Sequence, residues 1–360
     1  MTATLITVGN LFRLPGEFYS YEVIKNGNIN STYKVTYNRP DGTLKTYIFQ
    51  KINTYVFKDP VGIMENIDRV TTHIRDKEGE GIKLHFHHTE DGANYVFDEA
   101  NSFWRVMNFV DSITFNTSSD LRVVRSTGRA FGCLQTDLSD FDGSVLHETI
   151  PGFHNTRRRL DTLFAHVEED PVGRVAKVRA EIDYIASVRE RACELWDKYE
   201  RGEFPIRVTH NDTKSNNVLF DRNTLDPLVV IDLDTVMPGM AMYDFGDAVR
   251  FAANTAAEDE SDLSKVSFDV DKFRAFCEGY IPEVKESLTA AEIDSMVLGA
   301  FSITIELAAR FLDDYITGDK YFKTLYPKHN LVRTRCQLHL AKDIAGKFDE
   351  LSAIVAEYCK

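Results

Sequence analysis

The sequence predicts an α+β fold with two lobes, a small antiparallel β lobe followed by a larger, mainly helical lobe. Residues from about 18 to 110 alternate β-branched or aromatic residues with polar ones, which is typical of strands. After about residue 120 the apolar residues follow helical spacing instead. The 360 residues, 43% of them hydrophobic, exceed what one ordinary domain usually holds. We therefore expect two units.

The first unit is expected over residues 1–110. Three strands are predicted by YSYEVIK, STYKVTY and TLKTYIFQKI, which are separated by the turn signals NGN and RPDG. Helical spacing over residues 59–74 predicts one helix. Further strands are predicted by KLHFHH, NYVFDE and FWRVMNFV. The last of these leads into a connector at about residues 107–110.

The second unit is expected over residues 111–360. Helices are predicted at 123–138 and 172–199, with three more between 271 and 358. One of these begins at Thr289, which together with Glu292 has the spacing of a capping box. Two strand-sized runs, NNVLF and PLVVIDL, flank a turn-forming segment and predict a β-hairpin among the helices.

Composition excludes several classes of partner. The net charge is −14 and the basic residues are scattered, which argues against nucleic acid or an anionic membrane surface as a target. No window approaches the roughly 18 apolar residues of a membrane span, and the N-terminus MTATLITVGNLF lacks the features of a secretory signal. Five widely spaced cysteines read as reduced thiols. We expect a cytoplasmic monomer.

The segment HNDTKSNN, with VVIDLDT after it, carries the chemistry. Asp212 lies five residues before Asn217, and Asp232 follows the second strand of the predicted hairpin. The hairpin would bring Asn217 and Asp232 to one end, where an amide and a carboxylate oxygen suit Mg²⁺. Asp212 would face the group that reacts with a metal-bound phosphate, as phosphoryl transfer requires. The alternative is ordinary turn chemistry of Asn and Asp.

These residues resemble a known family. His210, Asn211 and Asp212 with Asn217, followed by Asp232, resemble the aminoglycoside phosphotransferase and choline kinase superfamily, whose fold is protein-kinase-like. Longer segments are similar to the bacterial N-acetylhexosamine 1-kinases, which use ATP to phosphorylate the anomeric hydroxyl of N-acetylglucosamine and N-acetylgalactosamine. They are RVTHNDTKSNNVL, IDLDTVMPGMAMYDFGDAVRF, AARFLDDYITGDKYF and YPKHNLVRTR, with GRAFG and WRVMNF extending the similarity over nearly the whole chain.

The resemblance implies roles for the catalytic and nucleotide-binding residues. Asp212 would be the catalytic base, and Asn217 and Asp232 would hold Mg²⁺. The adenine of ATP would bind the connector backbone at Asn108, Phe109 and Val110.

The resemblance also implies an acceptor site for the N-acetylhexosamine. Phe251 would pack on the sugar ring, Arg310 would hydrogen bond to it, and Asp234 would add a polar wall. Alternatively, Phe251 is a core residue and Arg310 forms a helix ion pair with Glu306, four residues before it.

The predicted nucleotide lobe departs from the superfamily at two places. Gln50 stands where kinases carry a lysine on the third strand, while Lys51, paired with Glu65, is the alternative. The expected phosphate loop has a single glycine, so side chains and backbone N–H groups would hold the phosphates. They belong to Asn28, Asn30, Ser31 and Thr32, and Asn28 would also approach the sugar.

Two other functions are compatible with this sequence. A kinase of the same fold acting on choline, ethanolamine, homoserine or an aminoglycoside is the first. A nucleotide-binding regulatory protein without catalysis is the second, although Asp212, Asn217 and Asp232 are all present. A Rossmann enzyme is disfavoured because no GxGxxG follows a first strand.

Overall fold

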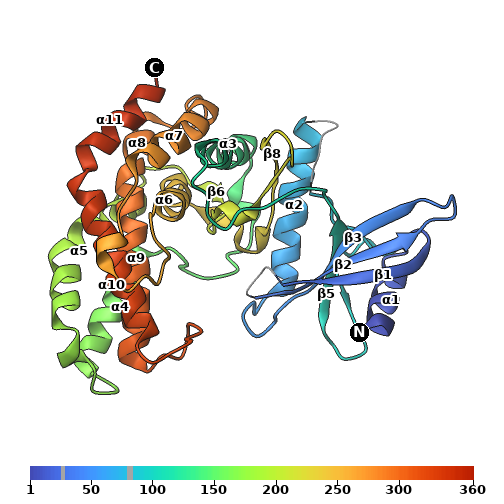
Figure 1. Ribbon diagram of the computed structural model, residues 1–360, viewed down its shortest axis with the longest axis horizontal. Helices are drawn as coiled ribbons and strands as arrows, with labels where there is room; N and C mark the ends of the chain where they lie inside the picture. The colour runs from blue at the N-terminus through green and yellow to red at the C-terminus, as the bar shows by residue number, and fades with distance from the viewer. Residues whose placement is uncertain (26–28, 79–83) are drawn as a thin grey trace.

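The computed structural model describes residues 1–25, 29–78 and 84–360. It has an antiparallel sheet with two flanking helices in one lobe and a larger helical lobe beside it (Figure 1). The predicted α+β class is confirmed.

The sheet has the strand order β1-β2-β3-β5-β4. The strands are β1 (Glu17–Ile24), β2 (Ser31–Asn38), β3 (Leu44–Lys51), β4 (Val96–Phe97) and β5 (Phe103–Asn108). The first three coincide with the predicted alternating runs. The RPDG turn joins β2 to β3, with Gly42 at φ +81° as this turn requires. The predicted NGN turn, residues 26–28, lies outside the described residues.

Residues 84–88 of the segment KLHFHH and the segment NYVFDE form less sheet than the sequence predicts, and Lys83 lies outside the described residues. Phe86 makes only an isolated bridge with Met107, near one end of β5. At the other end, Val96 of the two-residue β4 pairs with Trp104. Both segments thus share one edge of a single six-residue strand, which leaves each of them few partners.

Two helices cover the two faces of the sheet. The sequence reading missed α1 (Thr2–Leu11), whose Leu5 and Val8 pack in one core with Val35 and Phe49 of the strands. The predicted helix α2 (Pro60–Glu78) covers the other face and stands between the sheet and the helical lobe (Figure 1). The apolar core between α2 and the sheet continues into the second lobe through residues such as Leu233. The two lobes are therefore joined by apolar packing along α2.

The helical lobe surrounds a central helix, α9 (Met296–Thr317), which is buried on most sides. The other helices are α3 (Leu121–Asp137), α4 (Thr156–Glu169), α5 (Arg179–Glu200), α6 (Ala241–Ala252), α7 (Val270–Val284), α8 (Ala290–Asp294), α10 (His329–Gly346) and α11 (Phe348–Tyr358). Five helices lie where three were predicted between 271 and 358, because turns at Ser295 and Lys347 interrupt the apolar pattern. Thr289 and Glu292 form the predicted capping box.

The sequence reading placed the start of α5 too early. The helix begins at Arg179 rather than at residue 172, because Gly173 has φ +69° and a short 3₁₀ helix, Val175–Lys177, precedes it. Two other helices, α4 and α6, were not predicted.

Two short antiparallel ribbons lie between the lobes. The predicted hairpin is β7 (Val218–Phe220) with β8 (Pro227–Val230). The second ribbon pairs β6 (Arg207–Thr209) with β9 (Met237–Gly239). None of the helices in the described ranges combines the length and apolar character needed to cross a membrane.

Candidate active site

The β7–β8 hairpin brings Asn217 and Asp232 together. Asn217 immediately precedes β7 and Asp232 lies two residues after β8. The backbone N–H of Ile231 donates to the carbonyl of Asn217 at 2.8 Å, which closes this end of the hairpin. The Asn217 amide in turn donates to the backbone carbonyl of Asp212 at 2.8 Å and to its carboxylate at 3.2 Å. The three residues predicted for catalysis and metal binding therefore form one cluster.

A buried carboxylate, Asp244 of α6, holds the loop that carries Asp212. It accepts hydrogen bonds from the N–H groups of His210 at 2.6 Å and Asn211 at 2.8 Å. The His210 ring donates from Nε2 to the carbonyl of Ile231 at 2.9 Å, which joins the loop to the segment bearing Asp232. Asn211 adopts φ +63°, a costly conformation for a residue other than glycine. The loop is thus fixed from two sides.

Asp244 gives the protein a pH-dependent stability. Burial raises the pKa of Asp244 to about 6 from the ordinary 3.8, so the folded state retains this proton more strongly than the unfolded chain does. Its contribution to the free energy of unfolding therefore falls as pH rises from about 4 through 6, and we expect the Asp244→Asn variant to be free of this loss. Between pH 4.5 and 7.5 the wild type should lose about 2 kcal/mol relative to the variant. Urea unfolding of both proteins at the two pH values measures this, and parallel pH dependences would contradict it.

Lys214 is a site residue that the sequence reading did not assign. Its Nζ lies 2.6 Å from a carboxylate oxygen of Asp212. Burial acts to lower the pKa of Lys214, but the carboxylates of Asp212 and Asp247 outweigh it and the pKa is raised. Lys214 therefore keeps its charge beside the predicted base. Its position two residues after Asp212 in the sequence could have identified it as a site residue.

The donor set at the hairpin end fits a hard divalent cation. Asp232 is in the left-handed backbone region, with φ 63° and ψ 54°. Burial, with the neighbouring carboxylates of Asp234 and Asp212, raises its pKa to about 6, and a bound cation would relieve this crowding of negative charge. Within residues 1–25, 29–78 and 84–360, no cluster of three or more His, Cys, Asp or Glu side chains has a metal-binding arrangement. A site with two protein ligands suits Mg²⁺, which takes its other ligands from water and phosphates.

The expected phosphate loop meets the catalytic lobe through Asn30. Its amide donates to the carboxylate of Asp234 at 2.8 Å and its side-chain oxygen accepts from the N–H of Asn53 at 3.0 Å. Thr32 accepts a 3.1 Å hydrogen bond from the Gln50 amide, and Ser31 lies between them at the start of β2. Asn28 lies outside the described residues.

The alternative lysine position faces away from this cluster. Gln50 pairs in register with Arg105 of β5, whereas Lys51 pairs with Trp104, which belongs to the core on the α1 side of the sheet. Because paired residues on adjacent strands share a face, Gln50 lies on the catalytic side and Lys51 on the other.

Glu65, the α2 residue considered as the partner of Lys51, and its neighbour Asn66 both bind the helical lobe instead. The Glu65 carboxylate is 2.6 Å from His147 Nε2. The Asn66 amide donates to the carbonyls of His147 at 2.8 Å and Val236 at 3.0 Å. Both residues thus tie α2 to the helical lobe.

Among the described residues, the connector offers one backbone N–H without a hydrogen-bond partner. The N–H of Asn108 donates to the carbonyl of His85 at 3.0 Å, and that of Phe109 to Thr46 at 3.4 Å. Within the described residues, the N–H of Val110 makes no hydrogen bond. An adenine ring bound at this edge would accept a hydrogen bond from the Val110 N–H.

The predicted acceptor residues lie on two helices that pack together. Phe251 is in the last turn of α6 and Arg310 is on α9. The Arg310 guanidinium lies 5.3 Å from the ring centroid of Phe153 and 5.7 Å from that of Phe322.

Glu306 connects this acceptor region to the catalytic loop. Its carboxylate is bound by His154 at 3.0 Å and Thr156 at 2.7 Å. The other nitrogen of His154 donates to the carbonyl of Asn211 at 3.2 Å. Asp234, by contrast, directs its carboxylate to Asn30 and Arg105 of the β lobe.

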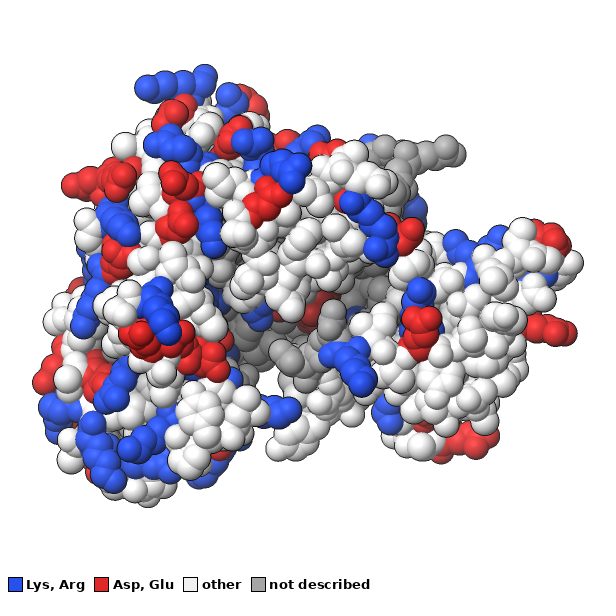
Figure 2. Space-filling view, viewed as in Figure 1, with Lys and Arg blue, Asp and Glu red and all other residues white. Residues whose placement is uncertain are grey.

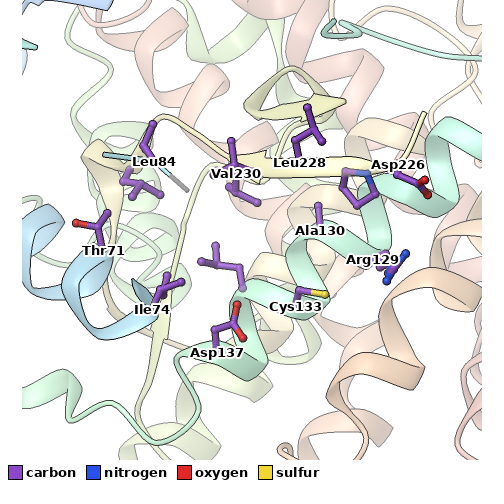
Figure 3. A pocket seen from close by; sticks show the side chains of 14 residues that line it. Thr71, Ile74, Leu84, Arg129, Ala130, Cys133, Asp137, Asp226, Leu228 and Val230 are labelled. Atoms are coloured by element: carbon purple, nitrogen blue, oxygen red, sulfur yellow. The ribbon is translucent and has the colours of Figure 1, made fainter. Parts of the chain in front are cut away.

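The surface is hollowed between the two lobes (Figure 2). A separate apolar cavity of about 460 Å³ lies between α2, α3 and β8, lined by side chains such as Ile74, Cys133 and Val230 (Figure 3). None of the predicted site residues lines it. We place the candidate site at the hairpin end because the charged and amide groups converge there.

Together with this fold, a match to a family profile defines the protein as a phosphotransferase that acts on small molecules. A profile of the phosphotransferase enzyme family, APH, matches residues 20–282, more than half of the chain, and the protein belongs to that family.

Solved structures support the fold. An aminoglycoside phosphotransferase from Alicyclobacillus acidocaldarius superposes with a TM-score of 0.63 at 12% identity, covering 98% of this chain and 96% of that one. A choline kinase from Cryptosporidium parvum gives 0.55 at 14% identity and 99% coverage of both chains. An amicoumacin kinase solved with AMP-PNP and Ca²⁺ gives 0.54 at 14% identity, covering 93% and 91%. At these identities the similarity concerns the fold.

Proposed function

We propose that the protein is an ATP-dependent kinase that phosphorylates the anomeric hydroxyl of N-acetylhexosamines, acting as a cytoplasmic monomer. The observation that carries the kinase assignment is the cluster of Asp212, Asn217 and Asp232 at the hairpin end, with Asn30 of the β lobe joined to the same region through Asp234. This cluster combines a base, a metal-binding pair and a link to the nucleotide lobe.

The transfer step is assigned to the groups around Asp212. Its carboxylate accepts the proton of the acceptor hydroxyl while the oxygen–γ-phosphorus bond forms and the bond to the β,γ-bridging oxygen breaks, which releases ADP. Lys214, at 2.6 Å from that carboxylate, provides positive charge beside the transferring group. Mg²⁺ held by Asn217 and Asp232 would neutralise charge on the phosphates.

The nucleotide is assigned to the β lobe. The free N–H of Val110 would bind adenine at the connector formed with Asn108 and Phe109. Its phosphates would lie against Asn30, Ser31, Thr32 and Gln50. Gln50 contributes amide hydrogens where other kinases use a lysine.

The charges near Arg310 favour a neutral acceptor. Burial and the nearby charge of Arg310 lower the pKa of Arg159, so two guanidinium groups share this region. Two guanidinium groups against the single carboxylate of Glu306 leave an excess of positive charge, which disfavours a cationic acceptor such as choline. The rings of Phe153 and Phe322 beside Arg310 offer apolar surface for a sugar ring, Phe251 would pack on that ring, and Arg310 offers donors for its hydroxyl or acetamido oxygens.

An acceptor panel tests the proposal. ADP release from Mg-ATP is measured with N-acetylglucosamine, N-acetylgalactosamine, galactose, choline, ethanolamine, homoserine and kanamycin. Turnover that is highest on the N-acetylhexosamines supports it. Preferential turnover on an amine would move the assignment to another alcohol kinase of this family, and nucleotide binding without turnover on any acceptor would favour a regulatory protein.

Arg310→Met is expected to raise KM for the N-acetylhexosamine about tenfold, because it removes a charged donor to the sugar. KM for ATP should stay unchanged, since the nucleotide binds in the other lobe. Arg174→Met is the matched control, because Arg174 also lies over an aromatic ring, at 4.7 Å from the Tyr315 centroid, but bonds to Asp319 instead. Equal changes in both variants would show that Arg310 is only structural.

A further inference from the structure

Arg105 is a buried cation on the catalytic face of the sheet. It lies on β5, directly paired with Gln50 of β3, and its side chain is 1% exposed. The sequence reading did not single it out, since WRVMNF reads as a strand leading to the connector. A guanidinium at this depth is costly unless its hydrogen bonds are satisfied by specific partners.

Its partners come from three segments. Nε donates to the side-chain oxygen of Gln50 at 2.9 Å, and NH1 donates to the carboxylate of Asp234. NH1 also lies 3.8 Å from the sulfur of Met64 in α2. No hydrogen bond from NH2 is formed within the described ranges of the chain. Arg105 thus joins β3, α2 and the segment after β8.

These contacts close a ring with the phosphate loop. The Gln50 oxygen is held by Arg105, so the Gln50 amide nitrogen is directed to Thr32 at 3.1 Å. Asp234, held on one oxygen by Arg105, accepts from Asn30 on the other at 2.8 Å. Within the described residues, the link from Gln50 to Thr32 and the link from Asp234 to Asn30 therefore both depend on one guanidinium, while the Asn30 side-chain oxygen is held separately by Asn53.

In the described part of the β lobe, the lysine–glutamate pair expected in a kinase is missing from this face. Gln50 replaces the lysine, Lys51 is on the opposite face with Trp104, and Glu65 is bound to His147. Arg105 supplies a positive charge to the same face from the adjacent strand. Because its side chain is planar and has a fixed set of donors, it orients Gln50 and Asp234 at once.

We propose that Arg105 is a positioning residue for the nucleotide phosphates: it fixes the Gln50 amide and, through Asp234, the Asn30 anchor of the phosphate loop. The inference rests on the proposed function in that ATP is the phosphoryl donor. In the β lobe, a network centred on Arg105 would then take the place of the lysine–glutamate pair.

The test measures binding of AMP-PNP with Mg²⁺, and of adenosine alone, by calorimetry. Arg105→Met is expected to weaken AMP-PNP binding about tenfold or more, because charge-assisted hydrogen bonds that orient the loop are lost. Adenosine affinity should be unchanged, since adenosine lacks phosphates. Gln50→Leu should cause a comparable loss. The double variant should lose no more than the weaker-binding single variant, because the two residues act through each other.

Two further variants separate positioning from stability. Arg105→Lys keeps a charge for Asp234 but lacks the Nε donor to Gln50, so it should fold and show a smaller loss selective for AMP-PNP. If Arg105→Met fails to fold, the Arg105→Lys variant tests the positioning role instead. Arg207→Met is the matched control, because Arg207 forms a buried two-bond pair with Glu292, at 2.9 and 2.8 Å, away from the β lobe. It should lower the melting temperature without changing the ratio of the two affinities.

The outcomes separate this inference from the proposed function. Folded Arg105 variants with wild-type AMP-PNP affinity, or with equal losses for AMP-PNP and adenosine, would overturn the positioning role and leave the kinase assignment standing. Wild-type protein that fails to bind AMP-PNP would overturn the proposed function itself.

Discussion

Replacing Asp212 with asparagine is expected to lower kcat by about 10²- to 10⁴-fold while leaving ATP affinity close to that of the wild type. The amide has the shape of the carboxylate but cannot accept the proton of the acceptor hydroxyl. The Asn217 contact to the backbone carbonyl of Asp212, at 2.8 Å, does not depend on the side chain, so the loop should keep its geometry. Steady-state ADP release and calorimetric titration with AMP-PNP measure the two quantities.

The matched control for this variant is Asp226→Asn. Asp226 is an exposed residue at the turn of the same hairpin and should leave both quantities unchanged. If Asp212→Asn retained more than about a tenth of the wild-type kcat, general-base catalysis by Asp212 would be wrong.

Asp232→Asn is expected to lower kcat/KM for Mg-ATP by about 10²-fold or more, because the anionic metal ligand is lost and metal binding contributes several kcal/mol to phosphoryl transfer. The loss should be partly recovered at high Mg²⁺, since an amide oxygen remains as a weaker ligand. The experiment is a Mg²⁺ titration of ADP release, together with Mn²⁺ binding followed by electron paramagnetic resonance.

Two comparisons make this second prediction specific. Asn217→Ala should shift the Mg²⁺ midpoint in the same direction, and Asp226→Asn should not shift it. An unchanged midpoint and unchanged Mn²⁺ binding in Asp232→Asn would place the metal elsewhere.

The parts of the fold that local pattern determines could be predicted from the sequence. The alternation in β1 to β3 and the turn chemistry at Gly42 specify an antiparallel sheet without reference to distant residues. The β7–β8 hairpin follows equally from two short apolar runs around a turn. By contrast, α1 was missed because its polarity pattern is weak and its apolar residues become informative only against the sheet that they cover.

The parts of the site that depend on strand register could not be predicted. Arg105 and Gln50 are far apart in the sequence, and only the β3–β5 register places them side by side. Asp244 likewise serves the catalytic loop from a helix that was not predicted. The motif HNDTKSNN identified the reacting groups, whereas the residues that hold them in place are defined by tertiary contacts.

The central claim is best tested by identifying the phosphorylated atom. The purified protein is incubated with Mg-ATP and N-acetylglucosamine or N-acetylgalactosamine, and the product is examined by ³¹P–¹H correlation NMR. The account predicts coupling of the new phosphorus to the anomeric proton, H1, together with stoichiometric ADP. Phosphate on another carbon, or no sugar phosphate while an amino alcohol is phosphorylated, would contradict it.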